Sequence, residues 1–522
     1  MVKVVIDNLP LETQPGLTVL KAAQQAGISI PHLCYHPAFI PEGSCRMCLV
    51  EIEGLPKLEL ACSTVVREGM KISTQSPRVR EARRGVLEFL LADHPLDCPI
   101  CDKAGECKLQ DYYGEYGLFE SAFREEKEKK DKKIRIADNL ILDRERCILC
   151  TRCVRFLREV TKTQELGIFH RGIRSEISTY EAELVQNNYS VNLVDLCPVG
   201  AITDTEFRFK TRAWFLKQME SICPLCSQGC NIYVDYHPGF PRIPGTAKVF
   251  RIRPRANDTI NGHWICNFGR AGYLLLEKDR WMNPVWRKGD RETILSWEKA
   301  LQVLAEKLRG LGASREKASV SLLLNSGLTN ETLFLTKKIF KDGLGLEKIY
   351  FADPRPGTGD GLLLQPDRTS NARGAKEMGF SLRQVGLEDF SQGLDILIII
   401  GPYLAELFSP AELKPALDPI GTKFLLTSRA SGLESLVDFV LPASSMNETS
   451  GTLTNKDGII QRFSRVFGPC GESRPEWVFI RDLGKELDIP IPGMPSLTDL
   501  EAVFRELGHE IPFFRNEPSW KS

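Results

Sequence analysis

The positions of the cysteines constrain this chain more than any other feature. Fifteen of its sixteen cysteines lie within the first 266 residues, and only Cys470 lies outside them. Together with one histidine, these fifteen divide into four sets of four residues, with the spacings that metal ligands have. In chain order the sets are Cys34, Cys45, Cys48 and Cys62; His94, Cys98, Cys101 and Cys107; Cys147, Cys150, Cys153 and Cys197; and Cys223, Cys226, Cys230 and Cys266.

The tight pairs within these sets favour metal over disulfide bonds. Soft thiolates suit zinc or iron-sulfur clusters, and a Cys-x2-Cys turn places two sulfurs at one metal centre while its amides can hydrogen-bond the sulfurs. Disulfides are the competing explanation, but they belong to oxidising compartments and small secreted domains. We therefore expect metal clusters.

The first set lies in a segment with the element order of a β-grasp ferredoxin. Val2, Val4 and Ile6 alternate with Lys3 and Asp7 as in a half-buried strand, and a turn leads into a second strand. A helix follows, which Thr18 can cap and Gly27 ends. The Cys-x10-Cys-x2-Cys-x13-Cys spacing then predicts a two-iron (2Fe-2S) cluster, although its first gap is longer than the four residues of plant-type ferredoxins.

The second set combines one histidine with three cysteines. A helix is expected from Val79 to the His94-Pro95 step, where proline cannot continue it, with one apolar face formed by Val79, Ala82, Val86, Phe89 and Leu90. A lone histidine is usually an ordinary surface or core residue. Here, however, the set reaches four ligands only if His94 is one of them. We expect a four-iron (4Fe-4S) cluster whose neutral imidazole ligand raises its potential. A structural zinc site is the alternative.

The third set is typical of a two-cluster ferredoxin that has kept one cluster. Such ferredoxins repeat Cys-x2-Cys-x2-Cys-x3-Cys-Pro, and the fourth cysteine of each motif ligates the other cluster. Here Cys147, Cys150, Cys153 and Cys197 remain. The other cluster has lost all four of its cysteine ligands together. The residues at those positions are Leu157, Asn187, Ser190 and Leu193. We expect a single four-iron cluster.

The fourth set, Cys-x2-Cys-x3-Cys-x35-Cys, begins with the spacing of a four-iron site at the entrance of a molybdopterin-type domain. Long loops between paired cysteines also occur in zinc ribbons, so zinc stays an alternative here. Cys470 is more simply a small buried or surface residue than a ligand.

The remaining sequence divides the chain into segments. Arg124 to Lys133 is a mixed charge run, expected to be a solvated linker or an exposed helix. The aliphatic runs Val320 to Leu324 and Ile396 to Ile400 predict parallel strands with crossover helices. The expected segments are a two-iron β-grasp domain, a four-iron domain with the histidine ligand, the linker, a ferredoxin-like four-iron domain, a four-iron domain of the Mo/W-bis-MGD type and an α/β domain, over residues 1–78, 79–118, 119–135, 136–213, 218–274 and 275–522.

Composition excludes several classes of function. At 522 residues, with 42% hydrophobic and 26% charged residues, the chain is expected to be globular and multidomain. Its 68 basic and 68 acidic residues balance, which disfavours nucleic acid as a partner. The longest aliphatic run is too short to cross a bilayer, and the first ten residues do not resemble a secretory signal, so we expect a cytoplasmic location without direct membrane insertion.

The order of the four sets resembles the 75 kDa (G-type) subunit family of NADH:quinone oxidoreductase, respiratory complex I. The motifs HLCYHP, GSCRMCLVE and ACST resemble its two-iron domain, and DHPLDCPICDKAGECKLQD resembles its histidine-plus-three-cysteine domain. DRERCILCTRCVRF and DLCPVGA resemble its ferredoxin-type domain. CPLCSQGC with ICNFGR resembles the extra four-iron site of bacterial members, and residues 371–379 and 448–463 resemble the family's molybdopterin-oxidoreductase-like segments.

The resemblance implies an electron-relay subunit with one 2Fe-2S and three 4Fe-4S clusters. Such a subunit accepts electrons from a flavin-bearing NADH-oxidising partner and passes them toward quinone, attached to the cytoplasmic face of the inner membrane through other peripheral-arm subunits. No catalytic residue of its own is expected, and the pattern G-x-G-x-x-G is absent. The chain departs from the family by a short C-terminal part, so the resemblance implies a truncated molybdopterin-oxidoreductase-like α/β domain over residues 275–522.

Two other functions remain open at this point. One is the electron-relay subunit of a soluble NAD-linked hydrogenase or formate dehydrogenase, which would typically keep the second ferredoxin cluster. The other is a catalytic pterin enzyme, but the residues after Cys266 look too few for a full active site. We expect no pterin or molybdenum, and a scaffold role for the C-terminal domain, although the loops at Ser326-Gly327 and Gly401-Pro402 follow predicted strands and could hold a ligand.

Overall fold

The computed structural model describes residues 1–117, 120–121, 123–240, 246–289, 291–310, 319–390, 393–489 and 499–515. Leu118, at the end of the expected second domain, Phe119 and Ala122, at the start of the expected linker, and the last residues up to Ser522 lie outside this description. The chain divides into two compact units, residues 1–215 and 216–522, and each is described by itself. Within the described residues, no helix is both long and apolar enough to cross a membrane.

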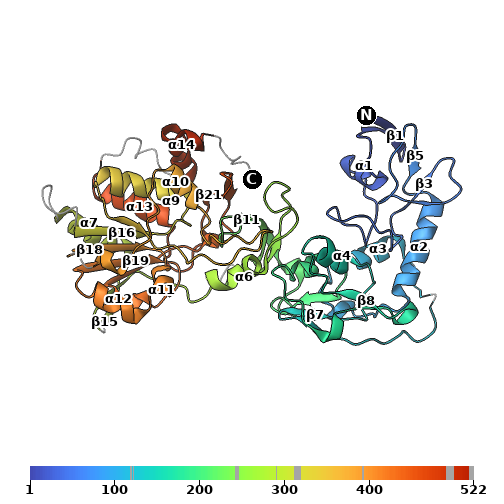
Figure 1. Ribbon diagram of the computed structural model, residues 1–522, viewed down its shortest axis with the longest axis horizontal. Coiled ribbons are helices and arrows are strands. Elements are labelled where there is room, and N and C mark those ends of the chain that lie inside the picture. The colour runs from blue at the N-terminus through green and yellow to red at the C-terminus, as the bar shows by residue number, and fades with distance from the viewer. Residues whose placement is uncertain are drawn as a thin grey trace. The chain divides into compact units, whose positions relative to one another are not determined.

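The first unit begins with a mixed five-stranded sheet in the order β2-β1-β5-β3-β4 (Figure 1). Its strands are β1 (Val2–Ile6), β2 (Leu9–Thr13), β3 (Leu49–Ile52), β4 (Glu59–Leu60) and β5 (Lys71–Ser73). β1 pairs antiparallel with β2 and parallel with β5. Helix α1 (Val19–Gln25) places its apolar side in one core with β1. As predicted, Thr18 caps α1 by accepting from the Lys21 N–H, and Gly27 follows it at φ +75°.

Helix α2 (Pro77–Ala92) leads from this sheet to the second ligand set. It starts two residues before the predicted Val79, because Ser76 caps it and proline is favourable in the first turn. The predicted apolar face was wrong in part, since Phe89 is 84% exposed and the buried stripe is Val79, Arg83 and Leu87. Arg83 is buried because its guanidinium donates to the Tyr116 hydroxyl and the Leu49 carbonyl. A pattern of apolar residues alone cannot show this.

The charge run at 124–133 forms no helix, and three of its lysines are anchored. Lys127 Nζ donates to the carbonyls of Leu91, Ala92 and His94, where it satisfies the C-terminal end of α2. Lys130 donates to the Ser175 carbonyl, and Lys132 pairs with Asp97 and Glu145. The run is thus mostly exposed and forms no helix, but Lys127 and Lys130 within it are half-buried.

Short elements frame the second and third ligand sets. They are α3 (Lys108–Tyr116), β6 (Ile134–Ala137), β7 (Leu140–Leu142), α4 (Arg152–Glu159), β8 (Gly167–Phe169), β9 (Glu176–Ser178), α5 (Asn192–Leu196) and β10 (Ile202–Asp204). Three of the strands form a sheet in the order β10-β7-β6, and β8 pairs with β9. These elements are only three to nine residues long, so much of this region consists of loops.

The second unit opens with the antiparallel sheet β11 (Lys217–Ile222), β12 (Asn231–His237) and β13 (Lys248–Pro254), followed by helix α6 (Asn267–Leu276). A seven-stranded sheet follows, in the order β15-β14-β20-β19-β18-β16-β17. Its strands are β14 (Val285–Lys288), β15 (Arg291–Ile294), β16 (Val320–Leu324), β17 (Ile349–Phe351), β18 (Ile396–Ile400), β19 (Thr422–Thr427) and β20 (Phe439–Pro442). The two aliphatic runs are β16 and β18, and they pair in parallel as predicted.

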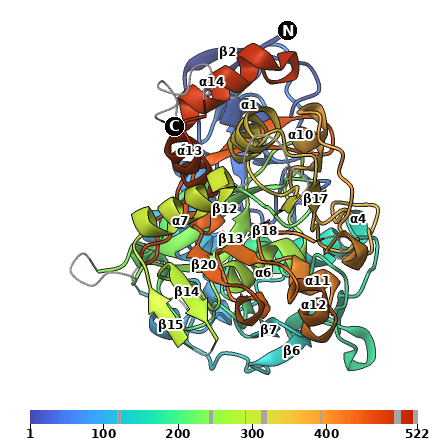
Figure 2. The ribbon, with the colours of Figure 1, turned by 90° about the vertical axis from the view of Figure 1, so that its left-hand side faces the viewer.

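Helices cover both faces of this sheet (Figures 1 and 2). Side chains from α7 (Trp297–Gly310), α9 (Asn330–Thr336), α10 (Ala372–Glu377), α13 (Glu476–Glu486) and α14 (Leu500–Glu510) pack in one core. Those from α11 (Leu404–Leu407) and α12 (Pro410–Leu417) pack in the other. The hairpin β21 (Gly451–Thr454) and β22 (Ile460–Phe463) contributes to a small core with Ile222 of β11. Five of the strands, β20, β19, β18, β16 and β17, pair in parallel as the sequence predicted for the aliphatic runs, and β14 and β15 add antiparallel pairs at one edge.

Candidate metal centres

The first set lies in two loops around the β-sheet of the first unit. Cys34, Cys45, Cys48 and Cys62 are all buried and free of disulfide bonds. The Cys34 N–H donates to Cys45 Sγ at 3.4 Å. A hydrogen bond from Cys45 lowers the pKa of Cys34, and one from Cys48 lowers the pKa of Cys62. The structure therefore brings these four thiols together in two interacting pairs.

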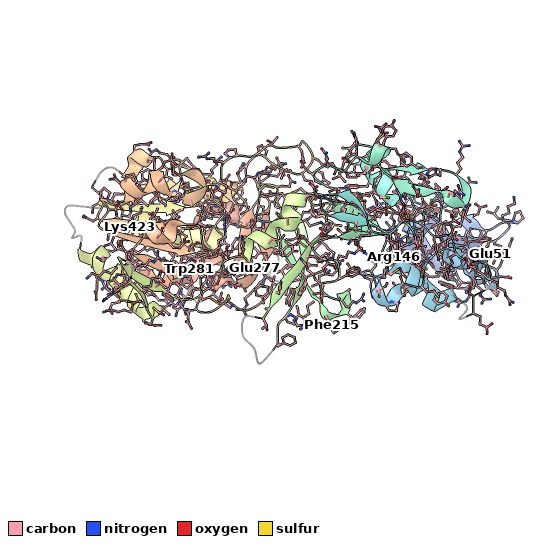
Figure 3. The ribbon with its side chains drawn as sticks, turned by 90° about the horizontal axis from the view of Figure 1, so that it is seen from below. Glu51, Arg146, Phe215, Glu277, Trp281 and Lys423 are labelled. Atoms are coloured by element: carbon pink, nitrogen blue, oxygen red, sulfur yellow. The ribbon has the colours of Figure 1, made fainter. Side chains whose placement is uncertain are left out.

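The second set lies at the end of α2 and in the loop before α3. Burial raises the pKa of Cys101 and raises that of Cys107 to about 11, while Cys98 is exposed. Cys98 and Cys107 each interact electrostatically with Cys101. Arg146, labelled in Figure 3, lowers the pKa of Cys101 and also that of His94.

His94 has the properties of a neutral ligand. Burial is the largest cause that lowers its pKa, to about 4, so the imidazole is uncharged at neutral pH. Its Nδ1 atom is buried without a hydrogen-bond partner among the described residues. A buried nitrogen without a partner is costly, and bonding to a metal would remove that cost. The donor set therefore fits a metal centre.

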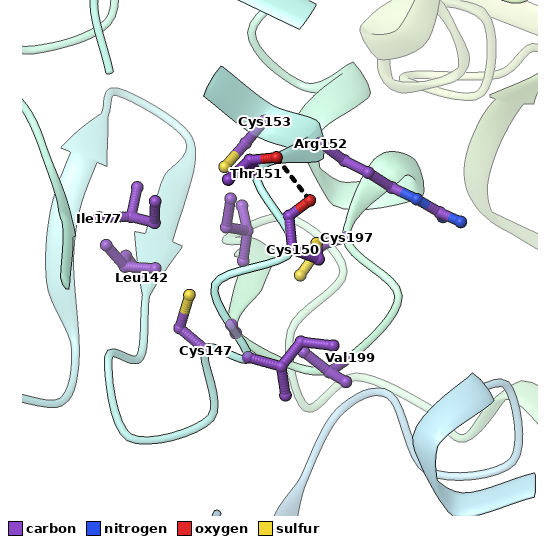
Figure 4. A pocket seen from close by; sticks show the side chains of 12 residues that line it. Leu142, Cys147, Cys150, Thr151, Arg152, Cys153, Ile177, Cys197 and Val199 are labelled. Atoms are coloured by element: carbon purple, nitrogen blue, oxygen red, sulfur yellow. Dashed lines mark hydrogen bonds between the residues drawn. The ribbon is translucent and has the colours of Figure 1, made fainter. Parts of the chain in front are cut away.

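The third set is the most fully assembled. Cys147, Cys150, Cys153 and Cys197 line a single small cavity (Figure 4). Its other walls are mainly apolar, with Leu142, Ile177 and Val199 among them. Burial raises the pKa of both Cys147 and Cys150 to about 12. Four thiols around an apolar cavity form a site suited to an iron-sulfur cluster.

The fourth set lies in the second unit, between β11 and α6. The Cys223 N–H donates to the Cys230 carbonyl at 2.8 Å, and the Gly269 N–H donates to Cys266 Sγ at 3.3 Å. Cys226, Cys230 and Cys266 each raise the pKa of Cys223, while burial is the largest cause of its rise. The distant fourth cysteine is thus brought to the other three.

One hydrogen-bond pattern recurs in all four sets. The backbone N–H two residues after a cysteine donates to that cysteine's sulfur and lowers its pKa. The pairs are Cys45 with Met47, Cys101 with Lys103, Cys107 with Leu109, Cys147 with Leu149, Cys150 with Arg152, and Cys223 with Leu225. Such amides stabilise thiolates and the negative charge of a bound cluster.

Backbone strain accompanies this pattern. Arg46, Leu149 and Thr151 lie between the cysteines of the first and third sets, and their φ angles are +58°, +52° and +59°. Left-handed backbone is costly for residues other than glycine, and it is retained where a site requires it. These turns direct successive amides toward one centre, which is the arrangement of an anion-binding nest.

Among the described residues, no three His, Cys, Asp or Glu side chains gather in the arrangement of a single-ion site. In a four-iron cluster each ligand binds a different iron, so the four sulfur atoms need not converge on one point.

Within the first unit, the second and third sets are in close contact. A Cβ atom at Gly200, three residues after Cys197, would lie 2.2 Å from Cys101 Sγ and 3.2 Å from Lys103 Cβ. The Lys108 N–H, next to Cys107, donates to the Pro198 carbonyl at 3.2 Å. Sequence reasoning missed Gly200, although a glycine directly after Cys-Pro-Val was visible.

We expect Gly200→Ala to disrupt the second set. The added methyl group overlaps Cys101 Sγ, so that ligand must move and the iron content should fall by about four atoms per chain. The matched control is Gly85→Ala within α2, where no atom outside the helix's own backbone lies within 4 Å of the added carbon and alanine favours the helix. Iron analysis of both purified variants checks this. Full iron content in Gly200→Ala would contradict the contact.

The positions of the predicted lost cluster lie in a packed region. Leu157 on α4 and Leu193 on α5 are fully buried, and α4 packs against α5. The Glu165 carboxylate accepts from the Asn187 side chain at 2.6 Å, and the Ser190 N–H donates to the Asn187 carbonyl at 3.3 Å. Side chains thus occupy the region of these four positions.

Four family models match parts of the chain. Residues 1–77 match a 2Fe-2S iron-sulfur cluster binding domain, and residues 83–122 match the NADH-ubiquinone oxidoreductase-G iron-sulfur binding region. Residues 138–203 match the ferredoxin-like domain of NADH-quinone oxidoreductase subunit 3. Residues 430–486 match molybdopterin oxidoreductase.

Curated relatives match about two thirds of the chain. The NADH-ubiquinone oxidoreductase 75 kDa subunit of Reclinomonas americana is 40% identical over 357 residues, covering 68% of this chain and 50% of the relative. A G-type subunit of the NADH-quinone oxidoreductase of Rhizobium meliloti (strain 1021) is 40% identical over 343 residues, covering 65% and 39%. The chain thus spans about half or less of these relatives' length. A crystal structure of an NAD+-reducing [NiFe]-hydrogenase in the H2-reduced state aligns with a TM-score of 0.36 and 31% identity, over 41% of this chain and 91% of that chain.

Proposed function

Because the chain belongs to the 75 kDa (G-type) subunit family of NADH-quinone oxidoreductase, we propose that it is the electron-relay subunit of such a complex. It accepts electrons from a flavin-bearing partner subunit and passes them toward a quinone site in another subunit. The partners hold it at the cytoplasmic face of the inner membrane. The chain itself needs no substrate site, because it binds neither NADH nor quinone in this role.

Each ligand set has an assigned role in this proposal. The first set holds a 2Fe-2S cluster, and the other three hold 4Fe-4S clusters, with His94 as the one ligand that is not cysteine. When bound, these clusters supply one-electron carriers. The chain's contribution is to bury the thiols, direct amides at their sulfurs and exclude water. The observation that carries the proposal is the third set, where Cys197 joins Cys147, Cys150 and Cys153 around one cavity.

Iron and sulfide analysis of protein purified without oxygen tests the assigned clusters. We expect about 14 irons per chain, with spectra of one two-iron and three four-iron clusters. The zinc content serves as the control, because the second and fourth sets could also form zinc sites. Stoichiometric zinc at either set would remove that set from the relay.

A further inference from the structure

Two arginines of α4 connect the loop of the first set to the loop of the third set. The Arg155 guanidinium donates to the Cys34 carbonyl, and at 3.4 Å it also reaches the Cys150 carbonyl. Arg152 donates to the Tyr35 carbonyl and, at 3.3 Å, to the Leu196 carbonyl. Each arginine therefore contacts the backbone at or beside a ligand of both sets.

These arginines place positive charge in a region that holds few negatively charged groups. Arg155 is only 1% exposed, and a buried cation is costly unless an anion pairs with it. Its carboxylate partner is Glu42, whose Oε2 lies 3.5 Å from Arg155 Nε and whose side chain is 41% exposed. The other groups that it contacts are neutral, namely backbone carbonyls, the Thr151 hydroxyl and the Phe39 ring.

Arg152 lies in the field of thiols from both sets. Burial lowers its pKa, whereas Cys150 and Cys34 raise it. An electron added to a cluster at either set would increase the negative charge near this pair of arginines. A fixed cation favours the reduced form of a nearby centre, and it does so more strongly where water is excluded.

We propose that Arg152 and Arg155 are positioning residues that raise the reduction potentials of the first and third centres together and fix the separation between them. The inference rests on the proposed function, because it requires clusters at both sets. Glu42 opposes the arginines, since its negative charge lies beside Arg155. Sequence reasoning missed this pair, although arginines recur after Cys150 in the pattern T-R-C-V-R.

Redox titration followed by electron paramagnetic resonance tests the charge effect in the intact complex. Arg155→Met should shift the reduction equilibrium of both centres toward the oxidised form by about tenfold, which corresponds to about 59 mV for one electron. Glu42→Gln should shift both centres in the opposite direction. Arg158→Met is the matched control, because Arg158 lies on the same helix, is 54% exposed and pairs with its neighbour Glu159.

Hydrogen exchange supplies a second readout on the same proteins. Arg155→Lys keeps the charge but loses the planar fork that reaches several carbonyls. Its potentials should stay near those of the unaltered chain, while exchange at residues 38–42 should rise. If the complex with Arg155→Met does not assemble, Glu42→Gln and Arg155→Lys test whether charge at this site sets the reduction potentials of both centres. Unchanged potentials in Glu42→Gln, or a shift at one centre only, would overturn the inference. Missing clusters in the unaltered chain would instead contradict the proposed function.

Discussion

A Cys150→Ser chain is expected to pass electrons from NADH to quinone at least about a hundredfold more slowly than the unaltered chain, a loss equivalent to about 2.7 kcal/mol in the barrier. Cys150 lines the cavity of the third set together with the other three cysteines (Figure 4). A serine oxygen is a harder donor than a thiolate and binds iron of this kind less well. In the proposed relay, loss of the third centre removes one of the electron carriers between the flavin-bearing partner and quinone, so transfer should slow.

Steady-state quinone reduction by the purified complex measures this effect. The matched control is Cys470→Ser, the one cysteine outside the four sets, whose Sγ lies 3.3 Å from Met282 Sδ. That variant should retain activity within about twofold, since surface and partly buried substitutions usually cost little. Equal losses in both variants would mean that the third set has no special role.

Removal of iron is expected to unfold the second and third ligand regions while the seven-stranded sheet of the second unit survives. Structural metal sites contribute on the order of 10 kcal/mol to folding. The loop from His94 to Cys107 holds only one short helical turn, at Cys98–Ile100, and Cys98 and Ile100 are exposed. Without a cluster, this loop would bury too little apolar surface to stay folded. The core shared by β16, β18 and α9 contains none of the candidate ligands.

Limited proteolysis before and after iron chelation checks this prediction. We expect new cleavage between residues 94 and 107 and around the third set, and fragments that contain residues 319–390 should persist. Native iron-loaded protein is the control for intrinsically accessible sites. Cleavage confined to the second unit after chelation would contradict the expected distribution of stability.

Local signals predicted the elements that short-range chemistry determines. Thr18 and Gly27 delimit α1, and the aliphatic run Ile396–Ile400 forms β18, because caps and continuous apolar runs depend on few neighbours. Phe89 was wrongly predicted to lie on the apolar face of α2, because which face of a helix is buried depends on what packs against it. The partial burial of Lys127 was not predicted for a similar reason, since its hydrogen-bond partners are carbonyls at the end of α2.

The candidate site likewise has features that local sequence signals predicted and features that they did not. Cysteine spacing indicated which thiols belong together, and the structure gathers the third set around one cavity. Spacing could not show that Gly200 abuts Cys101, because this contact joins residues far apart in the chain. It also could not show that Arg155 reaches Cys34, since that bond depends on how two loops fold against each other.

The central claim is that electrons from NADH pass through the centres of this chain. Rapid freezing of the intact complex after mixing with NADH, followed by electron paramagnetic resonance, tests it most directly. We predict that the centre at Cys147, Cys150, Cys153 and Cys197 becomes reduced within one turnover of quinone reduction, and that Cys150→Ser removes this signal. Quinone reduction at the full rate while this centre stays oxidised would contradict the proposed relay.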